Sequence, residues 1–370
     1  DDYTAKAELE SYLGGNHFVT MGLFYTHYRH SYAATTPLTL KRQNIHTAYD
    51  LLGAFVQDKI SVNDELSVLP GFRITILPHD ASLFLEPRVV LSYQLTSTLQ
   101  TKLGTGLYYQ WINGAQPASM FTFSGIDFWY PVERSTSASR AVQLSGDLSW
   151  NPDPAYSITV SGYTNWFANL VELKQNFEDY PNFGEMFDTG KGWNAGVELF
   201  VERSSGPIRG AVGYTLSWAL RQFDDIEEGR IFPARHDKRH TINIVGGVQL
   251  SETWSVSVAW MFSSGQAYTG IVGRYSFRPM GFEKLFPPFG YSHSLLSSKN
   301  GLRLPVYHRL DVSIGKTFRF DHWKLRLRLD VFNVYNRRNA LGANPDFSLN
   351  ADPYYRLLPI VPTVTVEAEF

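Results

Sequence analysis

The stretch "WKLRLRLDV", from Trp323 to Val331, alternates between two kinds of side chain. The apolar ones are Trp323, Leu325, Leu327, Leu329 and Val331, and the charged ones are Lys324, Arg326, Arg328 and Asp330. A period of two predicts an extended strand with one apolar and one charged face. In a soluble sandwich the apolar face would point into the core, whereas in a membrane barrel it would face lipid. The stretch fits both, so the rest of the chain has to decide.

The composition excludes several classes of protein and of binding site. The chain has 370 residues, a net charge of −2 and no cysteine, so neither a global attraction to nucleic acid nor a disulfide or thiolate metal site is expected. It has no apolar run of the roughly 18 residues that a membrane helix needs, but barrel strands need only half that apolar density. The chain starts with DDYTAK, without Met or a signal peptide, which is typical of a mature or truncated product.

The chain consists of long segments in which apolar and polar residues alternate. Tight turns and longer connections follow one another regularly between these segments. The tight turns are predicted at Gly14–Asn16, Val62–Asp64, Ser97–Thr98, Pro152–Pro154, Ser204–Pro207, Ser251–Thr253 and Phe320–His322. The longer connections are predicted at 32–45, 76–84, 113–138, 173–192, 223–238, 265–304 and 338–355. Gly, Asn, Asp and Pro supply the backbone geometry of hairpin turns, so the pattern predicts an up-and-down array of antiparallel strands.

The strands between these joins are long. They run to about 11–15 residues, whereas soluble strands have about five or six and tilted membrane strands need about 9–11. In the segment Trp254–Phe262, aromatic residues occupy both ends of the apolar face and valines lie between them. At about 3.3 Å per residue and a tilt of about 40°, its span covers roughly 20 Å, close to the height of a membrane apolar band. A sandwich strand also fits this segment alone, but the alternation of short and long joins favours a membrane barrel.

The chain ends in "PTVTVEAEF", in which Val364, Val366, Ala368 and Phe370 share one strand face. A terminal aromatic in phase with an apolar face resembles the signal by which outer-membrane barrels are recognised for insertion, so Phe370 is the expected insertion signal. The opening stretch can now be oriented. We predict that its leucines face lipid and that Lys324, Arg326, Arg328 and Asp330 face a water-filled or plugged lumen.

Seven tight turns and seven longer connections separate about fifteen strands. In bacterial barrels the short turns face the periplasm and the long loops face outside, and a closed single-chain barrel has an even number of strands. Because fifteen is odd, we expect residues 1–370 to be the C-terminal portion of one barrel domain whose first strands precede Asp1.

Several stretches resemble TonB-dependent outer-membrane receptors. They are "LLGAFVQDKISVNDELSVLPGFRI" (Leu51–Ile74), "FPARHDKRHTINI" (Phe232–Ile244), and "RLPVYHRLDVSIGKTF" (Arg303–Phe318) with "LDVFNVYNRRN" (Leu329–Asn339). Each motif is loose, but their order and spacing extend over nearly the whole chain. The resemblance implies an antiparallel transmembrane barrel of about 22 strands with a plugged lumen. The plug and the segment that engages TonB are not visible in this sequence.

The resemblance also implies a function and partners. The function is energised uptake of a scarce nutrient, such as a siderophore, cobalamin, a glycan or a peptide, across the Gram-negative outer membrane. The partners are outer-membrane lipid, TonB through the missing N-terminal region, the barrel assembly machinery, a surface lipoprotein and the nutrient itself. No nucleic acid and no cofactor are expected.

Three alternatives compete with the receptor. A passive porin-like diffusion channel shares every barrel feature and lacks only the plug, so it is the closer one. An outer-membrane barrel enzyme would need a positioned nucleophile or a carboxylate with a nearby His. The densest such cluster is His236, Asp237 and His240, but its segment is predicted as a loop entering a strand, so loop histidines are favoured over metal ligands. We therefore expect neither a catalytic nor a metal site, and a soluble repeat protein ranks last.

Two of the longer connections, 113–138 and 265–304, are rich in aromatic residues and too long to serve only as joins. Their candidate ligand-binding residues are Phe128, Trp129, Tyr130, Phe286, Phe289 and Tyr291. These rings could offer flat surfaces to sugars or chelates, or they could pack on one another and stiffen the loops. The sequence does not distinguish these roles and does not reveal the substrate.

Overall fold

The computed structural model describes residues 1–35, 42–79, 81–115, 128–131, 138–174, 187–277, 291–344 and 352–370. In this part of the chain nearly all regular structure is β, and the helical residues form one short 3₁₀ turn, η3 (Glu227–Gly229). None of the described helices is long and apolar enough to cross a membrane. The chain divides into two compact units, one of Asp1–Ala115, Phe128–Trp150 and Ser161–Val171, and one that includes Asn151–Val160 and Glu172–Phe370.

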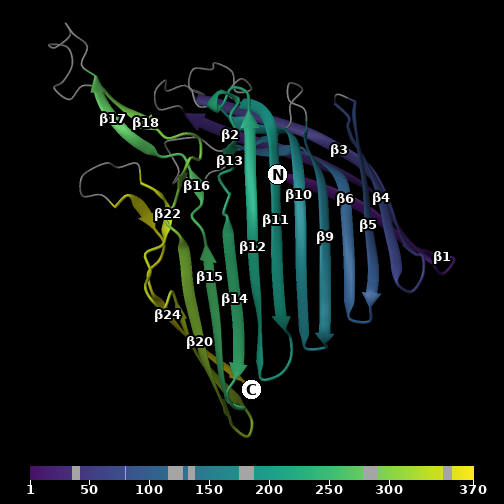
Figure 1. Ribbon diagram of the computed structural model, residues 1–370, viewed down its shortest axis with the longest axis vertical. Coiled ribbons are helices and arrows are strands. Elements are labelled where there is room, and N and C mark those ends of the chain that lie inside the picture. The colour runs from purple at the N-terminus through teal and green to yellow at the C-terminus, as the bar shows by residue number, and fades with distance from the viewer. Residues whose placement is uncertain are drawn as a thin grey trace. The chain divides into compact units, whose positions relative to one another are not determined.

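The long strands are hydrogen-bonded to their neighbours in chain order (Figure 1). They are β1 (Asp2–Leu13), β2 (His17–Thr35), β3 (Arg42–Ser61), β4 (Leu66–Leu77), β5 (Ser82–Thr96), β6 (Leu99–Gln110), β9 (Ser139–Asp153), β10 (Tyr156–Leu173), β11 (Phe187–Arg203), β12 (Ile208–Phe223), β14 (His240–Gln249), β15 (Trp254–Ser263), β20 (Tyr307–Arg319), β21 (Lys324–Phe332) and β24 (Val361–Glu369). Every register that is resolved between them is antiparallel. Within the described residues, the predicted up-and-down order and strand number are therefore confirmed.

All seven predicted tight turns join consecutive strands. In the turn between β1 and β2, Gly14 and Gly15 have φ values of 60° and 81°, which glycine adopts without strain. In the turn between β3 and β4, the Asn63 side chain accepts hydrogen bonds from the backbone N–H groups of Glu65 and Leu66, at 3.0 and 2.6 Å. Such side-chain bonds replace the strand ladder locally, which is why these residue types mark turns in the sequence.

The connection predicted at 76–84 is shorter than expected. β4 continues to Leu77 and β5 begins at Ser82, so residues 78–81 alone join them. Leu77 is buried with Tyr49 and Leu51, and Phe84 packs against this cluster. These apolar contacts prolong the strand pairing at this end of the first unit, and the sequence pattern around the turn gives no sign of them.

Other long connections contain short paired strands of their own. The pairs are β7 (Ile112–Ala115) with β8 (Phe128–Pro131), β16 (Ala267–Tyr268) with β19 (Leu302–Arg303), β17 (Ile271–Phe277) with β18 (Tyr291–Leu296), and β22 (Ala340–Ala343) with β23 (Tyr354–Arg356); β13 (Phe232–Pro233) pairs with β12. Segments of two to seven residues are too short for periodicity to separate them from loop. The sequence therefore predicts only longer connections there.

Two glycines in the first unit make room for aromatic rings on the neighbouring strand. Phe24 is paired with Gly53 across β2 and β3, and Phe55 is paired with Gly22. A Cβ atom at Gly53 would overlap the Phe24 ring, and one at Gly22 would lie 2.7 Å from the Phe55 ring. The Arg73 guanidinium also lies over the Phe24 ring, 4.1 Å from its centroid, so the ring is in contact with both neighbouring strands.

Gly53→Ala is therefore expected to lower the free energy of unfolding by about 1–3 kcal/mol, the usual cost of forcing extra volume into a packed site. The matched control is Gly162→Ala in β10, because a Cβ atom at Gly162 would meet nothing within 4 Å. Urea unfolding in lipid vesicles measures both changes. Equal midpoints for the two variants would show that the Phe24 ring does not constrain this position.

Candidate functional site

The opening stretch forms β21, and its two kinds of side chain lie on opposite faces. Leu327 is paired with Val366 of β24, and Arg326 with Glu367. The Arg326 guanidinium forms ion pairs with Glu367 and Glu369, both at 3.1 Å. The other predicted lumen residues lie on the same face, with Lys324 3.7 Å from Glu369 and Arg328 2.9 Å from Asp330. Strand pairing thus groups all four charged residues into one surface.

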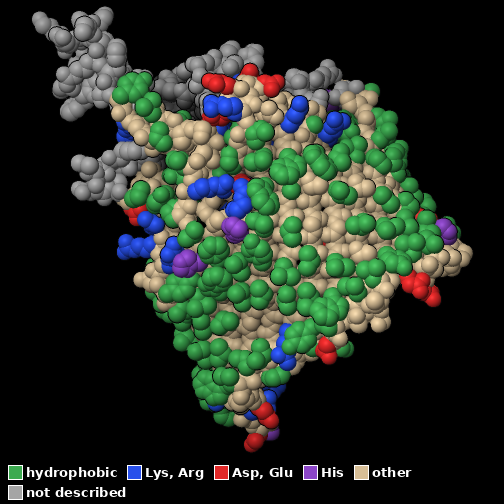
Figure 2. Space-filling model, viewed as in Figure 1, with side chains coloured by type: hydrophobic (Ala, Val, Ile, Leu, Met, Phe, Trp, Pro, Cys, Tyr) green, Lys and Arg blue, Asp and Glu red, His purple; other side chains and the backbone are tan. Residues whose placement is uncertain are grey.

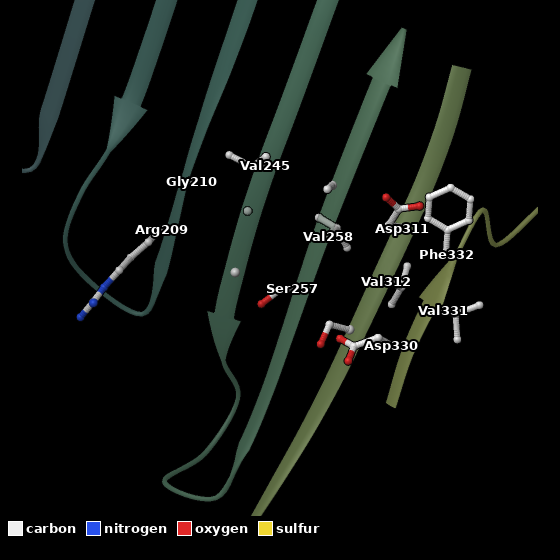
Figure 3. Close-up of a pocket in the computed structure, with 14 residues that line it drawn as sticks. Arg209, Gly210, Val245, Ser257, Val258, Asp311, Val312, Asp330, Val331 and Phe332 are labelled. Carbon is white, nitrogen blue, oxygen red and sulfur yellow. The ribbon is translucent and has the colours of Figure 1, made fainter. Parts of the chain in front are cut away.

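This charged face continues over the neighbouring strands of the second unit. One register row runs Arg209, Gly247, Ser257, Ser313 and Asp330 across β12, β14, β15, β20 and β21. Because the middle residues are small, the face is hollowed there by about 570 Å³. Figure 3 shows Arg209 at one border of this hollow, and the aspartates of β20 and β21 with Phe332 at the other.

The two carboxylates beside the hollow, Asp311 and Asp330, are each paired with an arginine. Asp311 accepts hydrogen bonds from Arg309 Nε at 3.0 Å and from the backbone N–H of Asn333 at 2.9 Å. Asp330 accepts one from Arg328 Nε at 2.9 Å. A general acid or base needs a carboxyl group free to exchange a proton with a substrate, and these are held by arginines. The hollow is suited to packing and binding rather than to proton transfer.

A buried aspartate joins two long connections of the second unit, 224–239 between β12 and β14 and 264–306 between β15 and β20. The Asp237 side chain is fully buried. Its Oδ1 accepts the backbone N–H of Ala219 at 2.7 Å, and its Oδ2 accepts a short bond from Arg303 Nη2 and one of 3.4 Å from Arg239 Nη2. Arg303 Nη1 also donates to the Asp237 carbonyl oxygen at 2.5 Å. One carboxylate therefore ties both connections to the end of β12.

A second set of buried contacts lies beside it. Asn300 Nδ2 donates to the carbonyl oxygen of Pro233 at 2.9 Å, and Lys299 Nζ lies 3.0 Å from Glu172 Oε1. Buried apolar side chains of the same unit include Phe223, Ile226, Phe232, Ala234 and Ala267. Polar groups this deeply buried are stable only when they are paired, so the bases of the two connections form a packed, ordered platform.

The predicted ligand-binding residues have no described side-chain contacts. Phe128, Trp129 and Tyr130 form most of β8, whose backbone pairs with β7, but their side chains are outside the described part of the structure. Phe286 and Phe289 lie outside the described residues altogether. Tyr291 opens β18, opposite Phe277. The assignment of these aromatics to ligand binding therefore stays a prediction.

The cluster of His236, Asp237 and His240 is not arranged as a metal site. The Asp237 carboxylate is occupied by Arg303 and Ala219, and His240 Nδ1 lies 3.0 Å from Tyr214 Oη. Among the residues that the structure describes, no group of three His, Asp or Glu side chains could hold a metal ion. Sequence reasoning missed the role of Asp237 because its main partner, Arg303, lies 66 residues further along the chain.

The C-terminal aromatic is fully accessible. Phe370 is 96% exposed, and its ring stacks on Trp323, with centroids 6.1 Å apart. Trp323 stacks in turn on Phe320 at 4.3 Å. The last residue is therefore part of an aromatic stack at the turn between β20 and β21, at the end of the strands opposite the long connections.

Comparison with known proteins identifies the family. The family model "TonB dependent receptor-like, beta-barrel" matches residues 1–334. Solved structures of similar fold include the ferric-catecholate import receptor Fiu from E. coli (13% identity over 99% of this chain, TM-score 0.65) and the siderophore receptor PirA from Acinetobacter baumannii (13%, 99%, 0.63). A mutant of the ferric enterobactin receptor PfeA from Pseudomonas aeruginosa, in complex with enterobactin, matches at 15% identity over 100% of this chain with a TM-score of 0.64.

The chain covers 54% of each of these three structures, so it spans about half their length. None of the curated proteins compared with the sequence matches it. The low identities show a shared fold, whereas the family match covers most of the chain. The chain belongs to the TonB-dependent receptor family, and the matched region is that family's antiparallel β-barrel, a domain of the Gram-negative outer membrane.

Proposed function

We propose that this chain is the C-terminal part of the barrel of a receptor for TonB-dependent, energised uptake of a scarce nutrient of the siderophore, cobalamin, glycan or peptide class. The observation that carries the proposal is the family match over residues 1–334. The family is one of receptors rather than enzymes, which disfavours the barrel-enzyme alternative. A passive channel would share the strand pattern, but the match is to energised receptors.

In this proposal the apolar strand face meets lipid and the charged face lines the lumen. The support is that apolar residues stay in register from strand to strand, as in the row Val212, Ile244, Trp260 and Leu310 across β12, β14, β15 and β20. Lys324, Arg326, Arg328 and Asp330 then face the lumen, and the hollow beside Asp311 lies on its wall. A segment that fills the lumen would pack there against small side chains and paired charges.

The long connections then face outside and carry ligand recognition. In the second unit, the bases of the connections 224–239 and 264–306 are locked by Asp237 and Lys299, which supports a fixed frame for recognition there. Phe128, Trp129, Tyr130, Phe286, Phe289 and Tyr291 remain our candidates for contact with the nutrient. A flat, aromatic surface suits a chelate or a sugar ring, because both present extended faces for stacking.

The partners follow from the same proposal. TonB would act through a segment outside this chain, the barrel assembly machinery would read Phe370, and outer-membrane lipid would cover the apolar face. The exposed stack of Phe320, Trp323 and Phe370 supports the second of these, because a recognition signal has to be accessible. A surface lipoprotein is a further partner that a receptor for an oligomeric nutrient could recruit.

The proposal predicts that uptake by the full-length parent protein requires energy. In cells that lack TonB, or after the proton gradient is dissipated, accumulation of the radiolabelled nutrient should fall to the background of receptor-free cells, while binding at the surface persists. The matched control is a general porin in the same cells, whose solute flux should not change. Normal accumulation without TonB would contradict the proposal, and steady conductance of the purified protein in a planar bilayer would favour the passive channel.

A further inference from the structure

An acidic residue interrupts the apolar face of β3. Leu52, Ala54, Val56 and Ile60 share one face of this strand, and Asp58 lies between the last two of them. Figure 2 shows hydrophobic side chains spread over the strands of the visible face, with acidic side chains mainly at the strand ends. A carboxylate on a face that meets lipid raises the free energy of the folded state unless it is paired, so Asp58 requires partners.

The described partners of Asp58 satisfy only part of its carboxylate. His17 Nδ1 lies 2.6 Å from Oδ2, whereas Oδ1 has no hydrogen-bond partner among the described residues. Across the sheet Asp58 is paired with Val19 of β2, and the register between β3 and β4 places it opposite Pro70. Neither neighbour has a side-chain donor. Because a carboxylate has about four lone-pair sites, most of its capacity to accept hydrogen bonds is unused.

The pair of Asp58 and His17 offers acceptors to its surroundings. When His17 Nδ1 donates to Asp58, a neutral imidazole has its free acceptor at Nε2. Both side chains can be reached, since His17 is 45% exposed and Asp58 25% exposed. The neighbouring residue, Lys59, lies on the opposite face of the strand. The complementary group is therefore a cation with several N–H donors, such as a primary ammonium.

An apolar hollow begins beside this pair on the same face. Ala7 and Ala54 lie in one register row there, and the face is hollowed by about 500 Å³ around them. Val56 borders the hollow and precedes Asp58 by two residues, which is about 7 Å along the strand. The tight turn at 62–64 lies on the other side of Asp58, so the hollow extends from Asp58 away from the turn. Acceptors at one end and an apolar hollow beyond them match the polarity of a lipid molecule.

We propose that Asp58 and His17 bind the primary ammonium headgroup of a phospholipid of the periplasmic leaflet, with one acyl chain in the hollow over Ala7 and Ala54. The inference rests on the proposed function, specifically on the apolar face meeting lipid and on the short turns facing the periplasm. The ammonium would donate to the Asp58 carboxylate and to His17 Nε2, and the acyl chain would run from there toward the bilayer centre. A quaternary ammonium has no N–H group and could not form these charge-assisted hydrogen bonds.

The test uses the full-length receptor, purified in detergent and incubated with phosphatidylethanolamine, phosphatidylcholine or phosphatidylglycerol of identical acyl chains. The first has a primary ammonium, the second a quaternary ammonium and the third no ammonium. Native mass spectrometry counts the lipids that stay bound. We expect phosphatidylethanolamine to be retained roughly tenfold more strongly than the other two, the ratio that one charge-assisted hydrogen bond provides. Asp58→Asn should remove that preference.

The matched control is Asp64→Asn, which makes the same change in the exposed tight turn and should leave the retention of phosphatidylethanolamine unchanged. Ala54→Leu tests the acyl chain separately. It fills the hollow while leaving the acceptors in place, so it should lower the retention of phosphatidylethanolamine. Unchanged retention in Ala54→Leu would overturn the placement of the acyl chain.

Equal retention of phosphatidylcholine would overturn the proposal, since binding would then not need N–H donors. Displacement of the lipid by millimolar ethanolamine would indicate a site for a free amine instead, and dimers without bound lipid would show that a second copy covers this face. If Asp58→Asn does not fold, the comparison of the three lipids on the parent protein still decides. Lipid retention is measured without TonB, so loss of the uptake proposal would leave this result intact.

Discussion

Leu329→Arg is expected to lower the free energy of unfolding in lipid vesicles by about 2–4 kcal/mol, the cost of an arginine near the bilayer midplane on the lipid face of a barrel. Leu329 is paired with Ile314 on one side and Val364 on the other, so its neighbours are wholly apolar. Leu327 is a weaker site for this test because it is paired with Lys316. Water that hydrates the Lys316 ammonium group could also hydrate a new arginine there and so reduce its cost.

The matched control lies one residue away on the opposite face. Arg328→Leu removes an exposed ion pair with Asp330, and such pairs contribute about 0–1 kcal/mol. Urea unfolding from vesicles, followed by tryptophan fluorescence, gives both values on one scale. Stabilisation by Arg328→Leu, together with no loss for Leu329→Arg, would show that the charged face, not the apolar one, meets lipid.

The sequence predicted the strands well because their signals are local. Alternation within β21 and the residues of each tight turn act over a few neighbouring positions, so a single sequence shows them. The short connection at 78–81 and the small hairpins β17–β18 and β22–β23 were not predicted. The connection at 78–81 depends on contacts between distant segments, such as Leu77 with Tyr49, that no periodicity records. The strands of the hairpins are too short for periodicity to separate them from loop.

The candidate site was predicted less completely, for a similar reason. Charged alternation identified Lys324 to Asp330 as one surface, but the ion partners of Arg326 lie 41 and 43 residues away on β24, at Glu367 and Glu369. Aromatic composition indicated the long connections, whereas their described side-chain contacts lie at the bases of the connections. The buried groups there, Asp237 and Lys299, are charged, and a charged residue in a loop is normally interpreted as solvated.

Asp237→Ala is the second change for which we expect a large effect. Its carboxylate is fully buried and is shared by Arg303, Arg239 and the backbone N–H of Ala219. Removing one partner of a buried ion pair leaves the others uncompensated and costs about 3–5 kcal/mol. Because those contacts join the long connections to β12, we expect the loss to appear as faster hydrogen exchange in 224–239 and 264–306, with the exchange of the long strands unchanged.

A control variant and a rescue variant distinguish loss of the buried ion pair from the loss of any acidic side chain. Glu252→Ala removes the partner of Arg319 in a tight turn, where the carboxylate is 86% exposed, and it should cost less than about 1 kcal/mol. Combining Asp237→Ala with Arg303→Met removes both charges and should restore part of the lost protection, because an apolar pair of similar volume can replace a buried ion pair. The loss of hydrogen-exchange protection in the double variant could instead equal the sum of the losses in the two single variants. Asp237 would then act mainly through the Ala219 N–H, and the contacts of Asn300 and Lys299 would hold the two connections together.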